Sequence, residues 1–363
     1  MSNTIISAGR IFTGEAWLNE HSVIIENGII KDVISSEQLQ TAAGRSAEIL
    51  IPAFIDLQIY GAYGKLLAVY PEADSLHKLY AYCIEGGAAH FLPTIATNTK
   101  DVFLKSIDAV REYWEEGGKG CLGIHLEGPW INKHKRGAHI EEEIHSPSLD
   151  EVKELLGYGK GVIRMITLAP EVCDRSVVEY ILQQGIVISA GHSNASYEEA
   201  NMGFQSGITA VTHLYNAMSG LQHRQVGLVG ATFLHPSVRA SIIADGHHVD
   251  YTAIRIAKKQ MQDRLFLITD AVTETSTGAY PHYPVGDKYE ASGILSGSMI
   301  TMHKAVLNLI DKAGIEKEEA IRMGCVYPAK VIGLDNKLGM IKKGYQSHIL
   351  VTDKNLNKVE TIS

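Results

Sequence analysis

Several side chains capable of metal binding or acid–base chemistry stand directly after short apolar runs of the sequence. Glu127, His192 and His213 each end such a run, and Asp270 ends another further along the chain. One carboxylate and two imidazoles are enough to hold a divalent ion such as Zn²⁺ or Fe²⁺ while leaving a position open for water. An aspartate beside that ion can accept and return protons. A further run ends in Asp245-Gly246-His247-His248, so a glutamate, several histidines and an aspartate stand at such positions. Together they predict a hydrolytic metal centre, provided that the fold brings them together.

Each of these residues also has a structural interpretation. A single histidine at the end of a strand is more often a hydrogen-bonded structural residue than a ligand. Glu127 could cap a helix or pair with Lys133 or Arg136. Ionisable residues nevertheless end five of the apolar runs, and unrelated structural needs seldom produce that pattern. Four further residues we interpret as structural: His235, His282, His303 and Cys121.

Eight apolar runs must position these residues. They lie at 50–56, 88–94, 120–127, 161–169, 185–192, 207–213, 238–245 and 265–270. Strands of a parallel sheet, which are buried on both faces, have such continuous apolar sequences. Helical stretches lie between the runs, among them 74–87, 100–116, 174–184 and 196–206, with Asp174 and Ser196 at the expected N-caps. Eight strands alternating with helices predict a (β/α)8 barrel, whose active site lies at the carboxyl ends of the strands.

The two ends of the chain have a different pattern. Residues 22–26 and 29–34 are predicted strands joined by Asn27-Gly28, a favoured hairpin turn, and another apolar strand is expected at 348–352. The fold class is therefore α/β: a TIM-type barrel with a small β-sandwich lobe formed by the N- and C-terminal segments. The expected division is residues 1–49 and 336–363 for the lobe and 50–335 for the barrel.

Composition and charge restrict the partners. Apolar residues make up 45% and charged residues 20% of the chain, as in an ordinary soluble protein. The net charge of −8 disfavours nucleic acid or an anionic membrane as a partner. No secretory signal and no apolar run of the roughly 18 residues that a membrane span needs are evident. The four cysteines are widely spaced, which fits a reducing compartment. We therefore expect a cytoplasmic protein.

Seven segments of the chain resemble the N-acetylglucosamine-6-phosphate deacetylases of the amidohydrolase superfamily, and they follow the family's order. They are HLEGPW (125–130), LAPE (168–171), SAGHSNA (189–195), THLYNAM (212–218), IADGHHVD (243–250), TDA (269–271) and LSGS (295–298). SAGHSNA, THLYNAM and HLEGP are the most specific of these. The resemblance implies deacetylation of N-acetylglucosamine-6-phosphate to glucosamine-6-phosphate and acetate.

The resemblance also implies a role for individual residues. Glu127, His192 and His213 would hold one divalent metal ion per subunit, Zn²⁺ or Fe²⁺, which activates a water molecule. Asp270 would be the general base and acid, and His139 would polarise the acetyl carbonyl. The implied substrate contacts are Ala138, Asn216, Ala217, Arg224, His248, Leu295, Ser296 and Gly297. The family further implies a homodimer, in which Arg224 reaches the site of the neighbouring subunit.

The chain departs from the family at two places. Where two-metal members carry His-x-His at the end of the first strand, this sequence has Gln58-Ile59-Tyr60. No lysine ends the fourth strand either, so a carbamylated-lysine bridge is not expected. We therefore predict one metal ion and not two. Residues 272–278 (VTETSTG) also differ from the apolar run that is usual there, which leaves the identity of the sugar open.

Three alternative functions remain at this stage. The same fold could act on N-acetylgalactosamine-6-phosphate or another N-acyl amino sugar. A cyclic amidase is disfavoured because His-x-His and the lysine are absent. A non-catalytic sugar-phosphate sensor is disfavoured because the ligand set and Asp270 are retained together.

Overall fold

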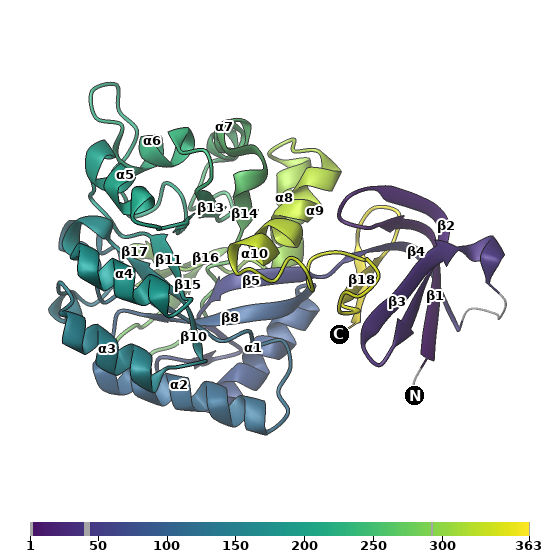
Figure 1. Cartoon of the computed structure of the whole chain (residues 1–363), viewed down its shortest axis with the longest axis horizontal. Coiled ribbons are helices and arrows are strands. Elements are labelled where there is room, and N and C mark those ends of the chain that lie inside the picture. Colours follow the sequence, from purple (N-terminus) through teal and green to yellow (C-terminus); the bar gives the residue numbers. More distant parts are fainter. Residues whose placement is uncertain (1–2, 40–43, 292, 363) are drawn as a thin grey trace.

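Eight parallel strands form the centre of the larger part of the molecule (Figure 1). The computed structural model describes residues 3–39, 44–291 and 293–362. In chain order the strands are β5 (Phe54–Ile59), β8 (Ala88–Ala96), β9 (Ile124–Glu127), β10 (Ile163–Leu168), β11 (Val187–Ala190), β12 (Ala210–Val211), β13 (Arg239–Ile242) and β14 (Leu265–Leu267). Each is hydrogen-bonded to the next in that order. The predicted barrel fold is confirmed.

The barrel closes between the end of β14 and the end of β5. The amide of Asp270 donates to the carbonyl of Gln58 at 2.9 Å, and the amide of Tyr60 donates to the carbonyl of Ala271 at 2.9 Å. Ile59 and Ala271 form a parallel bridge. The closure therefore places the Gln58–Tyr60 segment directly beside Asp270, although the two are far apart in sequence.

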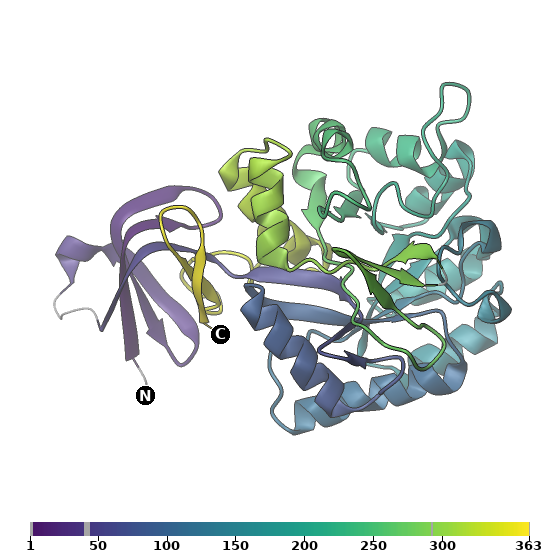
Figure 2. The ribbon, with the colours of Figure 1, turned by 180° about the vertical axis from the view of Figure 1, so that it is seen from behind.

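Helices cover the outside of the barrel (Figures 1 and 2). They are α1 (Ala73–Glu85), α2 (Lys100–Glu115), α3 (Leu149–Tyr158), α4 (Arg175–Gln183), α5 (Tyr197–Gln205), α6 (Gly227–Leu234), α7 (Tyr251–Met261), α8 (Met302–Asp311), α9 (Lys317–Gly324) and α10 (Val326–Val331). Ser196 caps α5 as expected, in a reciprocal capping box with Glu199. Asp174 occupies the N-cap position of α4, but its side chain accepts no capping hydrogen bond. The helices at 74–87, 100–116, 174–184 and 196–206 are present to within two residues at each end.

The two ends of the chain meet in one mixed six-stranded sheet, which forms the lobe. Its order is β19 (Lys358–Ile362), β18 (Ile349–Thr352), β4 (Arg45–Pro52), β1 (Asn3–Phe12), β2 (Trp17–Glu26) and β3 (Ile29–Ser35). Asn27 and Gly28 have φ of 51° and 76°, as the predicted tight hairpin between β2 and β3 requires. Buried aliphatic side chains from both ends of the chain, such as Ile6, Val23 and Ile349, form the core of the lobe.

The first predicted barrel strand is divided between two sheets. Leu50, Ile51 and Pro52 belong to β4 and pair with β18 of the lobe, and the barrel strand begins only at Phe54. The chain is buried without interruption from Ile49 to Ala62. Because both sheets bury this segment, its composition does not change where the chain passes from the lobe to the barrel.

A small three-stranded sheet follows Asp270 and lies at the carboxyl end of the barrel. It consists of β15 (Tyr283–Val285), β16 (Lys288–Ala291) and β17 (Ile294–Ser296). The backbone amide of Ser298 then donates to the carbonyl of Asp270 at 2.8 Å. After the three-stranded sheet, the chain therefore returns to the end of β14. A short hairpin of β6 (Gly61–Ala62) and β7 (Lys65–Leu66) extends β5 at the same end.

Candidate active site

A cavity of about 350 Å³ opens at the carboxyl ends of the barrel strands. All but one of the residues singled out from the sequence line it: Glu127, Ala138, His139, His192, His213, Asn216, Ala217, His248, Asp270, Leu295, Ser296 and Gly297. The exception is Arg224, which is exposed on the loop between β12 and α6. The fold therefore brings together residues that follow five barrel strands and residues at the end of the β15–β17 segment.

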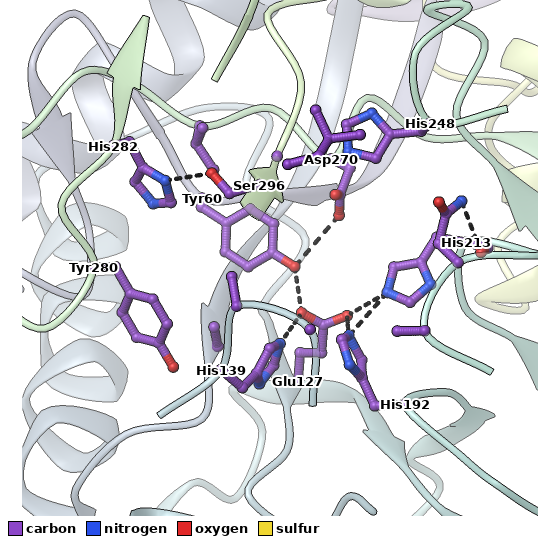
Figure 3. Close-up of a pocket in the computed structure, with 18 of the residues that line it drawn as sticks. Tyr60, Glu127, His139, His192, His213, His248, Asp270, Tyr280, His282 and Ser296 are labelled. Atoms are coloured by element: carbon purple, nitrogen blue, oxygen red, sulfur yellow. Dashed lines mark hydrogen bonds and ion pairs between the residues drawn. The ribbon is translucent and has the colours of Figure 1, made fainter. Parts of the chain in front are cut away.

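Glu127 stands at the centre of this group (Figure 3). Its Oε1 lies 3.1 Å from Nε2 of His213 and 3.4 Å from Nε2 of His192. The two Nε2 atoms are 3.0 Å apart. Its Oε2 lies 3.2 Å from Nε2 of His139. Glu127, His139 and His192 form a buried cluster able to hold a metal ion, and His213 contacts two of its three members.

The hydrogen bonds of Nδ1 in His192 and His139 indicate which ring nitrogen of each carries the proton. Nδ1 of His192 lies 2.8 Å from the carbonyl of Lys135 and must donate to it, which leaves a lone pair on Nε2. This is the arrangement usual for a metal-ligating histidine. Nδ1 of His139, in contrast, accepts the backbone N–H of Thr97 at 3.3 Å, which places the proton on Nε2. His192 is therefore prepared to coordinate, and His139 to donate a hydrogen bond.

Burial and neighbouring charges shift the pKa values of the group. Burial alone would raise the pKa of Glu127, but His192, His139 and His213 outweigh it and hold that pKa well below its usual range. Burial and the nearby His192 lower the pKa of His139 to about 4. Burial raises the pKa of Asp270. The nearby His213 acts to lower this pKa, and the charge of Glu127 acts to raise it further. Glu127 is therefore ionised and His139 neutral near pH 7.

Asp270 faces Glu127 across two side chains from the end of β5. Oδ1 of Asp270 accepts from Nε2 of Gln58 at 2.7 Å and from the hydroxyl of Tyr60 at 3.4 Å. The same Gln58 nitrogen donates to Oε1 of Glu127 at 3.0 Å, and the Tyr60 hydroxyl donates to Oε2 of Glu127. The two residues that replace His-x-His thus lie between the carboxylates (Figure 3).

The backbone is strained where several of these side chains turn into the cavity. Positive φ values occur at His192 (45°), His213 (36°), Ala217 (48°) and Asp270 (56°). A side chain other than glycine in this region costs on the order of 1–3 kcal/mol. The rest of the barrel holds these conformations, which direct the side chains away from the strand axis and toward one another.

The opposite end of the cavity from Tyr280 and His282 carries the residues expected to meet phosphate (Figure 3). Nδ1 of His248 lies 2.6 Å from Oδ2 of Asp245, so its Nε2 is the nitrogen left for another partner. Burial would raise the pKa of Asp245, but its hydrogen bond with His248 lowers it. Asn216 donates to the carbonyl of His213 at 3.3 Å. These contacts hold His248 and Asn216 in place beside the proposed metal ligands.

The sequence did not indicate several residues that line the cavity. Lys135 is the one lysine or arginine among the described lining residues, and its ammonium group has no ion pair in the described part of the chain. His282, which we interpreted as structural, also lines the cavity, with its Nδ1 2.7 Å from the hydroxyl of Ser296. An apolar wall is formed by Tyr60, Leu66, Val272 and Tyr280. The basic run 133–136 was the only available signal for Lys135.

The comparisons with known proteins agree with one another. Residues 49–362 match the Amidohydrolase family and residues 6–45 match the NagA composite domain. The N-acetylglucosamine-6-phosphate deacetylase of Haemophilus influenzae is 33% identical over 366 residues, 97% of this chain and 96% of that protein. The N-acetylgalactosamine-6-phosphate deacetylase of Escherichia coli O157:H7 is 30% identical over 365 residues, with coverage of 97% and 96%.

The fold is similar to a solved structure over nearly its whole length. The crystal structure of N-acetylglucosamine-6-phosphate deacetylase from Pasteurella multocida matches with a TM-score of 0.94 at 31% identity, covering 99% of this chain and 98% of that one. Among the described residues, no helix is long and apolar enough to cross a membrane.

Proposed function

Because this chain belongs to the N-acetylglucosamine-6-phosphate deacetylase family of amidohydrolases, we propose that it converts N-acetylglucosamine-6-phosphate to glucosamine-6-phosphate and acetate. The observation that carries the proposal is the buried cluster of Glu127, His192 and His213, which faces Asp270 in one cavity. Two different sugar phosphates are named for relatives of this chain, so the sugar is the part of the proposal that most needs a test.

The three proposed ligands fit one divalent ion. Oε1 of Glu127 and the Nε2 atoms of His192 and His213 lie within 3.4 Å of one another. A carboxylate and two neutral imidazoles suit Zn²⁺ or Fe²⁺, and three protein ligands leave a position open. Such an ion supplies Lewis acidity, which lowers the pKa of water towards about 7 and polarises an amide carbonyl.

Asp270 is the proposed proton carrier. Its raised pKa brings it nearer to the range in which a carboxylate can accept a proton from water and then donate it to the departing amine. Its Oδ1 accepts a hydrogen bond from Gln58, and Oδ2, which has no hydrogen bond to another described residue, would carry the proton. His139, with its proton on Nε2, would donate to the carbonyl oxygen as charge develops on it.

The remaining lining residues would orient the substrate. Asn216, Ala217 and His248 would meet the phosphate, while Leu295, Ser296 and Gly297 would cover the sugar and Ala138 would contact it. We propose a homodimer in which Arg224 completes the phosphate site of the neighbouring subunit. Arg224 is exposed and makes no ion pair within the described residues, so its guanidinium is available for that contact.

A second candidate substrate is N-acetylgalactosamine-6-phosphate. It is favoured by the 30% identity to a deacetylase of that name. The wall of the cavity also includes Val272, from the segment that departs from the family's usual sequence. The metal cluster and Asp270 would serve both sugars in the same way, because the sugars share the acetamide and the phosphate.

The test is acetate release from four compounds: the two sugar 6-phosphates and their unphosphorylated forms, with metal content measured on the same sample. We expect fast release from N-acetylglucosamine-6-phosphate alone, with about one metal ion per chain. Faster release from the galactosamine compound would reassign the sugar. If metal-free protein binds a sugar phosphate tightly and releases no acetate, the chain would be a sugar-phosphate sensor and not an enzyme.

A further inference from the structure

The side chains between Glu127 and Asp270 form a closed set of hydrogen bonds. Nε2 of Gln58 lies 2.7 Å from Oδ1 of Asp270, 3.0 Å from Oε1 of Glu127 and 2.8 Å from the hydroxyl of Tyr60. The Tyr60 hydroxyl in turn contacts Oε2 of Glu127 (Figure 3). Glu127 and Asp270 are only 1% and 8% exposed, so these hydrogen bonds lie in a largely buried environment.

Two buried carboxylates that lie this close repel each other unless a cation or a proton stands between them. Gln58 supplies two amide hydrogens and Tyr60 supplies one hydroxyl hydrogen. These three hydrogens can serve Oδ1 of Asp270 and both oxygens of Glu127. The pair therefore performs with neutral donors the task that a second cation would otherwise perform.

Tyr60 is also held in place independently of these hydrogen bonds. Its ring is 9% exposed and packs with Leu66, Val272 and Tyr280 in a small apolar cluster. Its backbone amide is fixed to Ala271 at the closure of the barrel. The hydroxyl is thus a rigid donor whose position does not depend on what occupies the cavity.

We propose that Tyr60 is a positioning residue: its hydroxyl, together with Nε2 of His139, holds Oε2 of Glu127 so that Oε1 faces His192 and His213, and with Gln58 it fills the space that a second cation would need. This inference rests on the proposed metal-dependent function and adds to it the contact through which Tyr60 acts on a metal ligand. Groups that orient a ligand in this way typically change metal affinity 10- to 100-fold when removed.

The experiment is a Zn²⁺ titration of the metal-free full-length protein in competition with a chromophoric chelator, without substrate. We expect the wild-type protein to bind one equivalent of Zn²⁺ tightly. Tyr60→Phe should bind one equivalent about 10- to 100-fold more weakly. Tyr63→Phe is the matched control, since this exposed tyrosine donates to Glu85 and does not line the cavity. Its Zn²⁺ affinity should be that of the wild type.

A second variant restores imidazoles to the same place. Gln58→His/Tyr60→His should take up two equivalents of Zn²⁺, because the neutral donors that exclude the second ion are gone. In activity assays Tyr60→Phe should lose kcat with little change in KM, because Tyr60 acts on a ligand rather than on the sugar. Thermal unfolding would check that both variants fold.

Two results would overturn the proposal: Zn²⁺ affinity in Tyr60→Phe within twofold of the wild type, or two tight equivalents in the wild type itself. The proposal can be tested even if Tyr60→Phe fails to fold, because the number of Zn²⁺ equivalents is measured on the wild-type protein. The proposal and the proposed substrate fail separately. If the protein binds one equivalent of Zn²⁺ tightly but releases no acetate, the proposed substrate is wrong and the proposed role of Tyr60 is unaffected.

Discussion

Histidine rings pack against one another at two places in the described part of the chain, and the neighbours of these rings differ. At the carboxyl ends of the strands, His192 and His213 converge on Glu127. At the junction with the lobe, His90 in β8 packs against His348 just before β18, with ring centroids 4.4 Å apart at 82°. Burial lowers the pKa of His90 to about 3, with His348 adding to the effect, and burial lowers the pKa of His348 to about 4.

The carboxylate makes the difference between the two places. Burial by itself lowers the pKa of His213 as well, but the hydrogen bond and charge of Glu127 outweigh it and the pKa is raised. Among the described residues, no carboxylate contacts His90 or His348, and both imidazoles are held neutral. Residue type and burial therefore do not distinguish a catalytic centre from a packing contact. The distinguishing feature is that the imidazole nitrogens converge on an ionised carboxylate oxygen.

The largest expected effect is at the carboxyl end. Asp270→Asn should lower kcat by about 10³-fold, because the variant cannot accept the proton from water. Metal content and substrate binding should be retained, since Asn keeps an oxygen for Gln58 and removes a charge that faces Glu127. Acetate release and metal analysis on one sample would check this. Near-normal turnover would exclude Asp270 from the mechanism.

An intermediate effect is expected at the phosphate end of the cavity. Arg224→Ala should raise KM for the phosphorylated sugar roughly 10- to 100-fold with kcat little changed, because a charge-assisted hydrogen bond is lost. Lys135→Ala is the informative comparison, since Lys135 lines the cavity of its own chain. If only Lys135→Ala raises KM, the phosphate is bound within one subunit and the proposed role of Arg224 is wrong. Lys133→Ala, on the same turn but outside the cavity, serves as the control.

The smallest effect on activity is expected at the junction. His90→Phe should leave kcat within about twofold, because His90 does not line the cavity. The substitution should instead change how the free energy of unfolding depends on pH. With a folded pKa of about 3 and an unfolded value near 6.5, the neutral imidazole favours folding above pH 6.5, and this contribution is lost as the pH falls towards 3.

The phenylalanine variant has no such proton to take up. Its free energy of unfolding should therefore fall less steeply than that of the wild type between pH 6.5 and the lowest pH at which both fold. Denaturant titrations at several pH values would measure both slopes. Parallel curves would show that His90 is not held neutral, and the contrast between the two histidine groups would disappear.

The sequence predicts the barrel well because each buried parallel strand leaves a continuous apolar run that ends in polar residues. This pattern located the strand ends that carry Glu127, His192, His213 and Asp270. It failed at residues 50–52, which are as apolar as the barrel strand but pair with β18. No composition signal marks a boundary between two sheets that are equally buried.

Other features of the site depend on tertiary contacts that the sequence does not show. Gln58 meets Asp270 only because the first and last strands close the barrel. His282 reaches the cavity because the chain leaves the rim and returns through β15–β17. The positive φ of His192 and His213 is imposed by the surrounding barrel, since this conformation is uncommon for any residue other than glycine.

The position of β4 between β1 and β18 has a consequence for synthesis. About three hundred residues separate the end of β4 from the start of β18. At a translation rate of about 5–20 residues per second, the apolar edge of β4 waits roughly 15 to 60 s for its partner strand. Unpaired edges of this kind recruit other chains. The newly made N-terminal segment is therefore the part of the molecule that most needs a chaperone during translation.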